Sequence, residues 1–425
     1  MSTSLRSLRT SPGRPAAERA AAGPTALRRR LAELRGPDVP PRPLDARALA
    51  ALAANPGCRR RALLDGAGVD KAALARALGT PAAFGQSQFA IARGNAFEAR
   101  VKADGGTELV RLLHAALPAG QAPEPPDAVD APDLSAAGPE GRTARTALAL
   151  REATAAGRWA LLDHPMLALT VAGTPAYLEP DAVVVHPDGT WTVVEIKSFA
   201  MIDGAADAAK AGAAARQAAV YALALETVAE RLPGPAPEDG RVRHEALLVC
   251  PKDFSNLPAA ALLDLRKQRA TTRRQLGRLT RVEEIAAALP PGASFAPDRP
   301  AAELTAAVEA VDAAYAPDCL AACELAFHCR DRARAEGDVR HLGRNVRSGL
   351  GGLTTVEAAL AAARGDHPSD AAELPSDASD RPSHAAEPPD GPEDPAVAAL
   401  RRAAALRAEA LAAAGFPKEE ADACR

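Results

Sequence analysis

The sequence predicts an α/β protein, and alternating strand and helix signals in the middle of the chain carry this prediction. The segments Ala182–Val185 and Trp191–Ile196 are short, apolar and rich in β-branched residues, which is typical of strands. A long Ala-rich helix follows them, and residues 245–250 form another apolar strand. With a helix through Arg151 and a strand at Leu167–Val171 before this pair, the predicted order is helix, three strands, helix and strand.

A tight turn joins the two central strands. Residues 187–189 are Pro, Asp and Gly, the pattern of a three-residue hairpin loop that ends in a glycine bulge. This loop length sets a register that pairs Val183 with Val193 and continues to Asp181 opposite Glu195. Opposite residues project from the same face of a sheet, so the two carboxylates are predicted to lie side by side.

The predicted carboxylate pair indicates a metal site. Two carboxylates about 5 Å apart repel each other, and buried like charges persist when a cation lies between them. Mg²⁺ or Mn²⁺ is the expected ion, because hard divalent cations prefer oxygen ligands. Lys197 shares the face of Glu195, and as one of only seven lysines it suggests a role that arginine would not fill, such as orienting a water molecule. The alternative is an ordinary surface hairpin with a cross-strand salt pattern.

These residues resemble a known motif. Pro180-Asp181, thirteen further residues and Glu195-Ile196-Lys197 are similar to the motif of the PD-(D/E)-x-K nuclease superfamily, and in particular to its RecB-like exonuclease branch. The resemblance implies a restriction-endonuclease-like core, which is a mixed β-sheet flanked by helices. It also implies that Asp181, Glu195 and the Ile196 carbonyl bind the catalytic ion while Lys197 acts on the water.

Two further segments match the same branch. Gln217 and Tyr221 are four residues apart on one helical face and resemble the Gln-x-x-x-Tyr motif, whose residues in the family help to hold the lysine and the nucleic-acid strand. Upstream, Glu98 shares a predicted helix face with Gly94 and Ile91 and would be a third acidic ligand. The chain departs from its relatives here, because many of them have a histidine in this helix. A solvated glutamine and tyrosine, and a glutamate in a salt bridge, are the alternatives.

Four cysteines suggest a second metal centre. Cys319, Cys323 and Cys329 cluster within eleven residues, and Cys58 lies far upstream. The chain is long and poor in cysteine, which favours a reducing compartment and metal-binding thiolates over disulfides. One upstream and three downstream cysteines around such a core resemble the iron-staple nucleases, namely the AddB subunit and the CRISPR-associated RecB-like exonucleases. The resemblance implies a structural 4Fe-4S cluster.

The cysteine spacing leaves alternatives open. Cys-x3-Cys-x5-Cys differs by one residue from the commoner form of the motif, and His328 beside the last cysteine offers another ligand. A tetrahedral Zn²⁺ site and simple buried thiols are therefore the other interpretations. Cys250 ends an apolar strand and is expected in the core, whereas Cys424 in the tail is expected to be a free thiol.

Breaks in composition predict four parts. Residues 1–36 form a basic arm that we expect to be disordered, with a short helix at its end, and residues 37–345 form the nuclease domain with the cysteines around its core. Residues 346–394 are predicted to be an acidic disordered linker, since 365–394 alone carry a net charge of −8. Residues 395–425 contain a last helix.

Helical segments fill the rest of the nuclease domain. The predicted helices span residues 44–78, 88–117, 258–289 and 301–314. Residues 266–281 hold seven basic residues and no acidic one, so they are either contacts to substrate phosphates or a solvated helix face.

Composition argues against several other classes of protein. No apolar run approaches the roughly 20 residues that cross a membrane, and no Walker A motif of a helicase motor occurs. Aromatic residues make up only 3% of the chain, which argues against base stacking on single strands as the main activity. We expect a cytoplasmic protein.

The sequence therefore predicts a metal-dependent deoxyribonuclease of repair, recombination or defence against foreign DNA, with exonuclease action favoured over endonuclease action. DNA is the expected partner, together with a helicase or another repair or defence subunit. Two alternatives stand beside this prediction. One is a catalytically inactive DNA-binding or scaffolding subunit with the same fold, and the other is a zinc-stabilised nuclease-like protein whose hairpin match is fortuitous.

Overall fold

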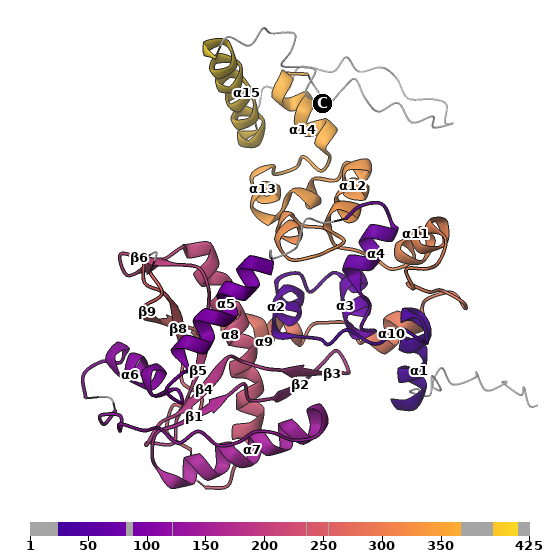
Figure 1. The fold of residues 1–425 in the computed structure, drawn as a ribbon. Coiled ribbons are helices and arrows are strands. Elements are labelled where there is room, and N and C mark those ends of the chain that lie inside the picture. Colours follow the sequence, from indigo (N-terminus) through magenta and orange to yellow (C-terminus); the bar gives the residue numbers. More distant parts are fainter. Residues whose placement is uncertain are drawn as a thin grey trace, which may run out of the picture.

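The protein has a mixed α/β architecture in which a five-stranded sheet lies between helices (Figure 1). The computed structural model describes residues 24–81, 88–120, 122–234, 236–253, 255–366 and 394–414. Within these ranges no helix is long and apolar enough to cross a membrane.

The strands are β1 Ala160–Asp163, β2 Leu167–Val171, β3 Thr174–Leu178, β4 Ala182–Val185, β5 Trp191–Ile196, β6 Met201–Ile202, β7 Ala205–Ala206, β8 Glu245–Pro251 and β9 Pro258–Asp264. The helices up to the crossover are α1 Pro24–Arg35, α2 Ala46–Ala54, α3 Arg59–Gly66, α4 Lys71–Ala77, α5 Gln88–Val101, α6 Thr107–Ala116, α7 Gly138–Ala156 and α8 Ala208–Ala229. The later helices are α9 Arg266–Leu276, α10 Val282–Ala287, α11 Ala301–Glu309, α12 Ala326–Glu336, α13 Arg344–Gly349, α14 Val356–Arg364 and α15 Pro395–Ala413, with short 3-10 helices at Pro317–Ala321 and Val339–Leu342.

The central sheet has the strand order β1-β4-β5-β8-β9. Neighbouring strands are antiparallel except for β5 and β8, which are parallel. A parallel pair needs a long crossover connection, and α8 supplies it. The prediction of a mixed sheet flanked by helices is confirmed.

The hairpin of β4 and β5 has the predicted register. Val183 pairs with Val193, and two further steps along the two strands, past Ala182 and Val194, bring Asp181 opposite Glu195. Gly189 ends the turn with φ of +79°, a left-handed conformation that glycine adopts without steric cost. The turn chemistry in the sequence therefore fixes which residues share a face of the sheet.

One strand of the central sheet was predicted wrongly. The segment Leu167–Val171 is a strand, but β2 pairs with β3 in a separate two-stranded sheet. The place beside β4 belongs to β1. The strand β1 has only four residues and follows α7 after a short turn. In the sequence its apolar residues therefore continue the pattern of the preceding helix and give no separate strand signal.

Apolar side chains alternate between two cores, one on each face of the sheet. Val183 belongs to a core that α2, α7 and α8 close, and Val184 belongs to a second core that α5 and α6 close. Asp181 and Glu195 share the parity of Val183. The side of the sheet that carries both carboxylates is thus the side that α8 covers (Figure 1).

Two predicted helical segments differ in the structure. Residues 88–117 form two helices, because Gly105 and Gly106 adopt left-handed conformations between α5 and α6. Residues 258–264 form the strand β9 rather than a helix, because they pair along their whole length with β8. The sequence of β9 alone, rich in Ala and Leu, favours a helix, and pairing with the sheet overrides that preference.

Helices extend the core at both ends of the chain. The short helix predicted at the end of the basic arm is α1, and its Leu34 is fully buried. The predicted linker 346–394 is wrong at its start, where α14 and most of α13 lie. Figure 1 shows α14 and α15 at the top of the view, beyond α12 and α13 as seen from the sheet. Residues 367–393 and Cys424 lie outside the described residues.

The break between α5 and α6 generates a stability prediction. A Cβ on Gly106 would lie 2.7 Å from a methyl carbon of Leu161 in β1, and φ there is +85°. Gly105 has a similar φ of +73° but open space around its Cα. We expect Gly106→Ala to lower the free energy of unfolding by about 1–3 kcal/mol more than Gly105→Ala does, because it adds a packing clash to the same backbone strain. Urea unfolding measures both, and equal losses would show that α6 does not press against β1.

Candidate active site

Asp181 and Glu195 share a cation, Lys197. Asp181 precedes β4, and the other two residues lie at the end of β5. The Lys197 ammonium forms an ion pair with Glu195 and lies 3.8 Å from Asp181 Oδ2. The Ile196 backbone N–H donates a hydrogen bond of 2.6 Å to the same Asp181 oxygen. The predicted juxtaposition of the three charged side chains is confirmed.

Burial disfavours the ionised form of both carboxyl groups. Glu195 is completely inaccessible to solvent, and burial raises its pKa to about 7 despite the nearby lysine. Burial also raises the pKa of Asp181, while Lys197 acts in the opposite direction. Burial alone would lower the pKa of Lys197, but the two carboxylates raise it. Apart from the Lys197 ion pair, no described residue gives Glu195 a hydrogen bond of regular geometry. A second cation at this place would therefore lower the free energy of the ionised pair.

Glu98 has a different environment. It approaches from α5 and accepts contacts from Lys102 Nζ at 2.6 Å and His164 Nε2 at 2.9 Å. These contacts hold the pKa of Glu98 down at about 2, with the His164 hydrogen bond as the largest cause. Glu98 is close enough to raise the pKa of Asp181. The predicted approach of this glutamate from a helix is correct, but in this arrangement the Lys102 ammonium and the His164 ring already contact its carboxylate.

Lys102 and His164 are site residues that the sequence analysis missed. The Lys102 ammonium also donates to the Asp181 carbonyl oxygen at 2.8 Å and pairs with Asp163 at 2.6 Å. One signal was available, because Lys102 lies one helical turn after Glu98 and is one of only seven lysines in the chain. His164 follows β1, the strand that the sequence analysis did not predict.

Gln217 and Tyr221 meet on α8 as their spacing predicts. The Gln217 side-chain amide donates to the Tyr221 hydroxyl at 3.1 Å, and that hydroxyl donates to the Glu179 carbonyl oxygen at 3.1 Å. Burial raises the pKa of Tyr221, and the charges of Glu195 and Asp181 add to the effect, which places the phenol beside both carboxylates. The hydroxyl thus fixes the residue that precedes Pro180-Asp181.

The donor set suits a hard divalent cation. Carboxylate oxygens of Asp181 and Glu195, with a carbonyl such as that of Ile196, are the ligands that Mg²⁺ and Mn²⁺ prefer. Among the described residues, no three acidic, His or Cys side chains already surround one point as ligands. Lys197 lies against both carboxylates, so ion binding would require its ammonium to move.

The four cysteines come together from regions more than 250 residues apart. Burial is the largest cause of the raised pKa of the Cys323 and Cys329 thiols. The charges of Cys58 and Cys319 also raise the pKa of Cys329. The charges of Cys58 and Cys329 likewise raise the pKa of Cys323. Three of the four are buried, and Cys319 is half-buried. Cys250 lies apart from them, in β8, with its side chain in the core as expected.

Two buried arginines lie against the cysteines. Arg60 donates to Cys329 Sγ at 3.2 Å and to the Val311 carbonyl oxygen at 3.1 Å. Burial lowers the pKa of the Arg61 guanidinium, whereas the charges of Asp65 and then Cys323 raise it. Arg61 therefore lies near Cys323. The cations would offset the negative charge that thiolate ligands carry when they bind a metal. The residue types present therefore suit a metal or an iron–sulfur cluster, but among the described residues no three of the cysteines already surround one point as ligands.

The basic segment 266–281 is partly neutralised. Arg269 and Arg273 of α9 form ion pairs with Glu226 of α8, and Arg266 pairs with Glu245. Among the described residues, none forms an ion pair with the exposed side chains of Lys267, Arg274 and Arg278. Contact with substrate phosphates thus stays a prediction for these three residues.

Comparisons of the chain with protein-family models, with curated proteins and with solved structures find no match. The site geometry therefore carries the functional argument.

The raised pKa of Glu195 generates a pH prediction. Its carboxyl ionises near pH 7 in the folded protein and near 4.5 when exposed, so metal-free protein should lose stability as pH rises through this interval. Glu195→Gln cannot ionise. We expect its free energy of unfolding to gain on the wild type by up to roughly 3 kcal/mol between pH 4.5 and 8. Urea unfolding in a chelator measures this, with the exposed Glu230→Gln as control. Parallel pH profiles for wild type and Glu195→Gln would contradict the electrostatic description.

Proposed function

We propose that this protein is a metal-dependent nuclease that hydrolyses DNA phosphodiester bonds, with exonuclease action favoured. The observation that carries the proposal is the fully buried Glu195 beside the half-buried Asp181 on one face of the sheet, with Lys197 against both. Two acids with one lysine have excess negative charge, and burial raises the pKa of each acid. A divalent cation would stabilise the ionised pair and would give the arrangement a chemical use.

Each site residue has a role in this proposal. Asp181, Glu195 and the Ile196 carbonyl hold the ion, which when bound supplies an activated water and polarises the phosphoryl oxygen. Lys197 orients the attacking water or offsets charge on the phosphate in the transition state. Gln217 and Tyr221 keep the segment before Asp181 in place through the Glu179 carbonyl. The roles of Asp181, Glu195, Ile196 and Lys197 agree with those that the nuclease resemblance implies. For Gln217 and Tyr221 the resemblance implies a different role, which is to hold the lysine and the nucleic-acid strand.

Glu98 has a conditional role as a third acidic ligand. Its carboxylate lies near Asp181 but is bound by Lys102 and His164. To reach the ion it would exchange these cations for the metal. Role and partner in the cell follow from the resemblance alone, which implies repair, recombination or defence and a helicase or similar subunit.

A structural 4Fe-4S cluster is the second part of the proposal. Cys58, Cys319, Cys323 and Cys329 would hold it, and the buried guanidinium groups of Arg60 and Arg61 would offset its charge. Such a cluster would tie the segment before α3 to the segment around α12 and so close a very long loop of chain. A Zn²⁺ ion with the same cysteines is the alternative.

The nuclease proposal is tested with labelled single- and double-stranded DNA and Mg²⁺ or Mn²⁺. We expect Asp181→Ala, Glu195→Ala and Lys197→Ala each to lower the cleavage rate by about a hundredfold or more, since each removes a group that acts on the reacting phosphate. Glu230→Ala and Arg29→Ala, both exposed and outside the proposed site, serve as matched charge controls. Near-normal cleavage by any of the three site variants would refute the assignment, and a wild type that binds DNA without cleaving it would favour the inactive DNA-binding subunit.

The cluster proposal is tested by colour and metal content. Protein purified without oxygen should be brown and contain iron and sulfide, and Cys58→Ala should lose both the colour and thermal stability. Cys250→Ala, which removes a buried thiol away from the group, should keep the colour. Colourless protein with stoichiometric zinc would replace the iron–sulfur cluster with a zinc site and leave the nuclease proposal standing.

A further inference from the structure

Lys102 is a second lysine beside the proposed ion site. It directly follows α5, one helical turn after Glu98, and its side chain is only 11% exposed. Phe97 of the same helix packs into the core on the face of the sheet opposite to the one that α8 covers. Lys102 therefore approaches the site from the opposite face to the side chains of Asp181 and Glu195.

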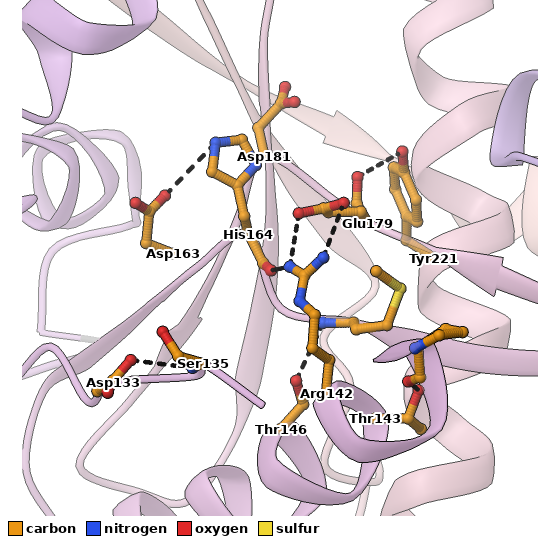
Figure 2. Close-up of polar contacts among 12 residues, drawn as sticks. Asp133, Ser135, Arg142, Thr143, Thr146, Asp163, His164, Glu179, Asp181 and Tyr221 are labelled. Carbon is orange, nitrogen blue, oxygen red and sulfur yellow. Dashed lines mark hydrogen bonds and ion pairs between the residues drawn. The ribbon is translucent and has the colours of Figure 1, made fainter. Parts of the chain in front are cut away.

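Oxygen atoms surround the Lys102 ammonium. Its Nζ lies 2.6 Å from Glu98 Oε1, 2.6 Å from Asp163 Oδ1 and 2.8 Å from the Asp181 carbonyl oxygen. Figure 2 shows the Asp163 and His164 side chains at the end of β1, with Asp181 next to the His164 ring. A protonated lysine has three N–H donors, so these three oxygens can use all of them. The planar guanidinium of an arginine would not match this compact arrangement.

These contacts determine what Glu98 binds. The Glu98 Oε1 atom that contacts Lys102 also lies 2.9 Å from His164 Nε2. Among the described residues no three acidic, His or Cys side chains surround one point as metal ligands. Glu98 therefore does not complete a site of three carboxylates with Asp181 and Glu195 while Lys102 holds it.

Glu98 is nevertheless a neighbour of the carboxylate pair. Burial is the main cause of the raised pKa of Asp181, and the charge of Glu98 adds to it. A Glu98 side chain that no longer pairs with Lys102 would thus lie close to a strongly negative group and would be drawn to any cation bound there. Release of Glu98 would raise the number of carboxylates at the site from two to three.

The number of carboxylates influences which divalent ion a site prefers. Mg²⁺ is usually held by one or two carboxylates and keeps several water molecules. Ca²⁺ takes about six to eight oxygen ligands, and its affinity depends on how many of them are charged. A site with only Asp181 and Glu195 suits Mg²⁺ or Mn²⁺, whereas a site that also includes Glu98 would suit Ca²⁺ better.

We propose that Lys102 determines which divalent ion the site accepts, because it holds Glu98 and so keeps the site at two carboxylates. This inference rests on the proposed metal site and goes beyond it, since it assigns the preference for Mg²⁺ and Mn²⁺ over Ca²⁺ to one side chain. Lys102 is a positioning residue in this assignment, because it acts on the ion through Glu98.

Calorimetric titration of Ca²⁺ and of Mn²⁺ into metal-free protein tests the inference. Lys102→Met has a side chain of similar length without the charge, so Glu98 becomes free to join the site. We expect its Ca²⁺ affinity to rise about tenfold or more over the wild type, with a smaller gain for Mn²⁺. Lys71→Met is the matched control, because Lys71 is 12% exposed and pairs with Asp65 outside the proposed site. It should leave both affinities unchanged.

A double variant separates the action through Glu98 from a simple loss of positive charge. In a Glu98→Gln background, Lys102→Met should give no gain in Ca²⁺ affinity, because no third carboxylate remains. An equal gain in that background would show that Lys102 acts by its charge alone and would overturn the inference. Lys102→Gln is also neutral but keeps a donor for the Asp181 carbonyl oxygen. It should shift the Ca²⁺ affinity in the same direction and preserves the test if Lys102→Met does not fold.

The outcomes distinguish this inference from the proposal on which it rests. If the wild type binds Mn²⁺ and neither Lys102 variant gains Ca²⁺ affinity, the inference is wrong and the metal site stands. If the wild type binds no Mn²⁺, the metal site itself fails, and the inference fails with it.

Discussion

The site depends on one physical constraint, which is the burial of Glu195 beside Asp181. A fully buried carboxylate loses its hydration, and its neighbour Asp181 carries the same charge. The single lysine that contacts both acids compensates only part of this cost, as the raised pKa of Glu195 shows. A protein whose sheet maintains such an arrangement has a site that favours added positive charge. This is why the geometry supports divalent metal chemistry better than a structural salt bridge.

The environment of Glu98 makes the contrast clear. Lys102 and His164 contact that carboxylate, and its pKa falls to about 2, whereas the pKa of Glu195 rises to about 7. Two neighbouring groups of charged residues are therefore compensated to different degrees. Glu98 and Asp163 are both in contact with Lys102, whereas Asp181 and Glu195 share Lys197 and the pKa of each is raised. Added positive charge would therefore stabilise the pair of Asp181 and Glu195 more than it would stabilise Glu98.

Local sequence determined much of the hairpin and little of its surroundings. The turn at 187–189 specifies register through short-range backbone geometry, so the positions of Asp181 and Glu195 followed from the sequence. By contrast, β1 is a short strand directly after a helix, and β9 has a composition that favours helix. Sheet pairing decides both, and a single sequence does not contain that information locally. His164 was missed for the same reason, since only the pairing of β1 with β4 brings it to Asp181.

Direct measurement of ion binding tests the central claim. Isothermal titration of Mn²⁺ into metal-free protein, in two buffers with different ionisation enthalpies, gives the stoichiometry and the number of protons released. We expect a single ion per chain and proton release near pH 7, because the ion favours the ionised form of Glu195. Glu195→Gln should lose both the binding and the proton release. An absence of saturable binding, or unchanged binding and proton release in Glu195→Gln, would contradict the claim that this buried carboxylate pair is a metal site.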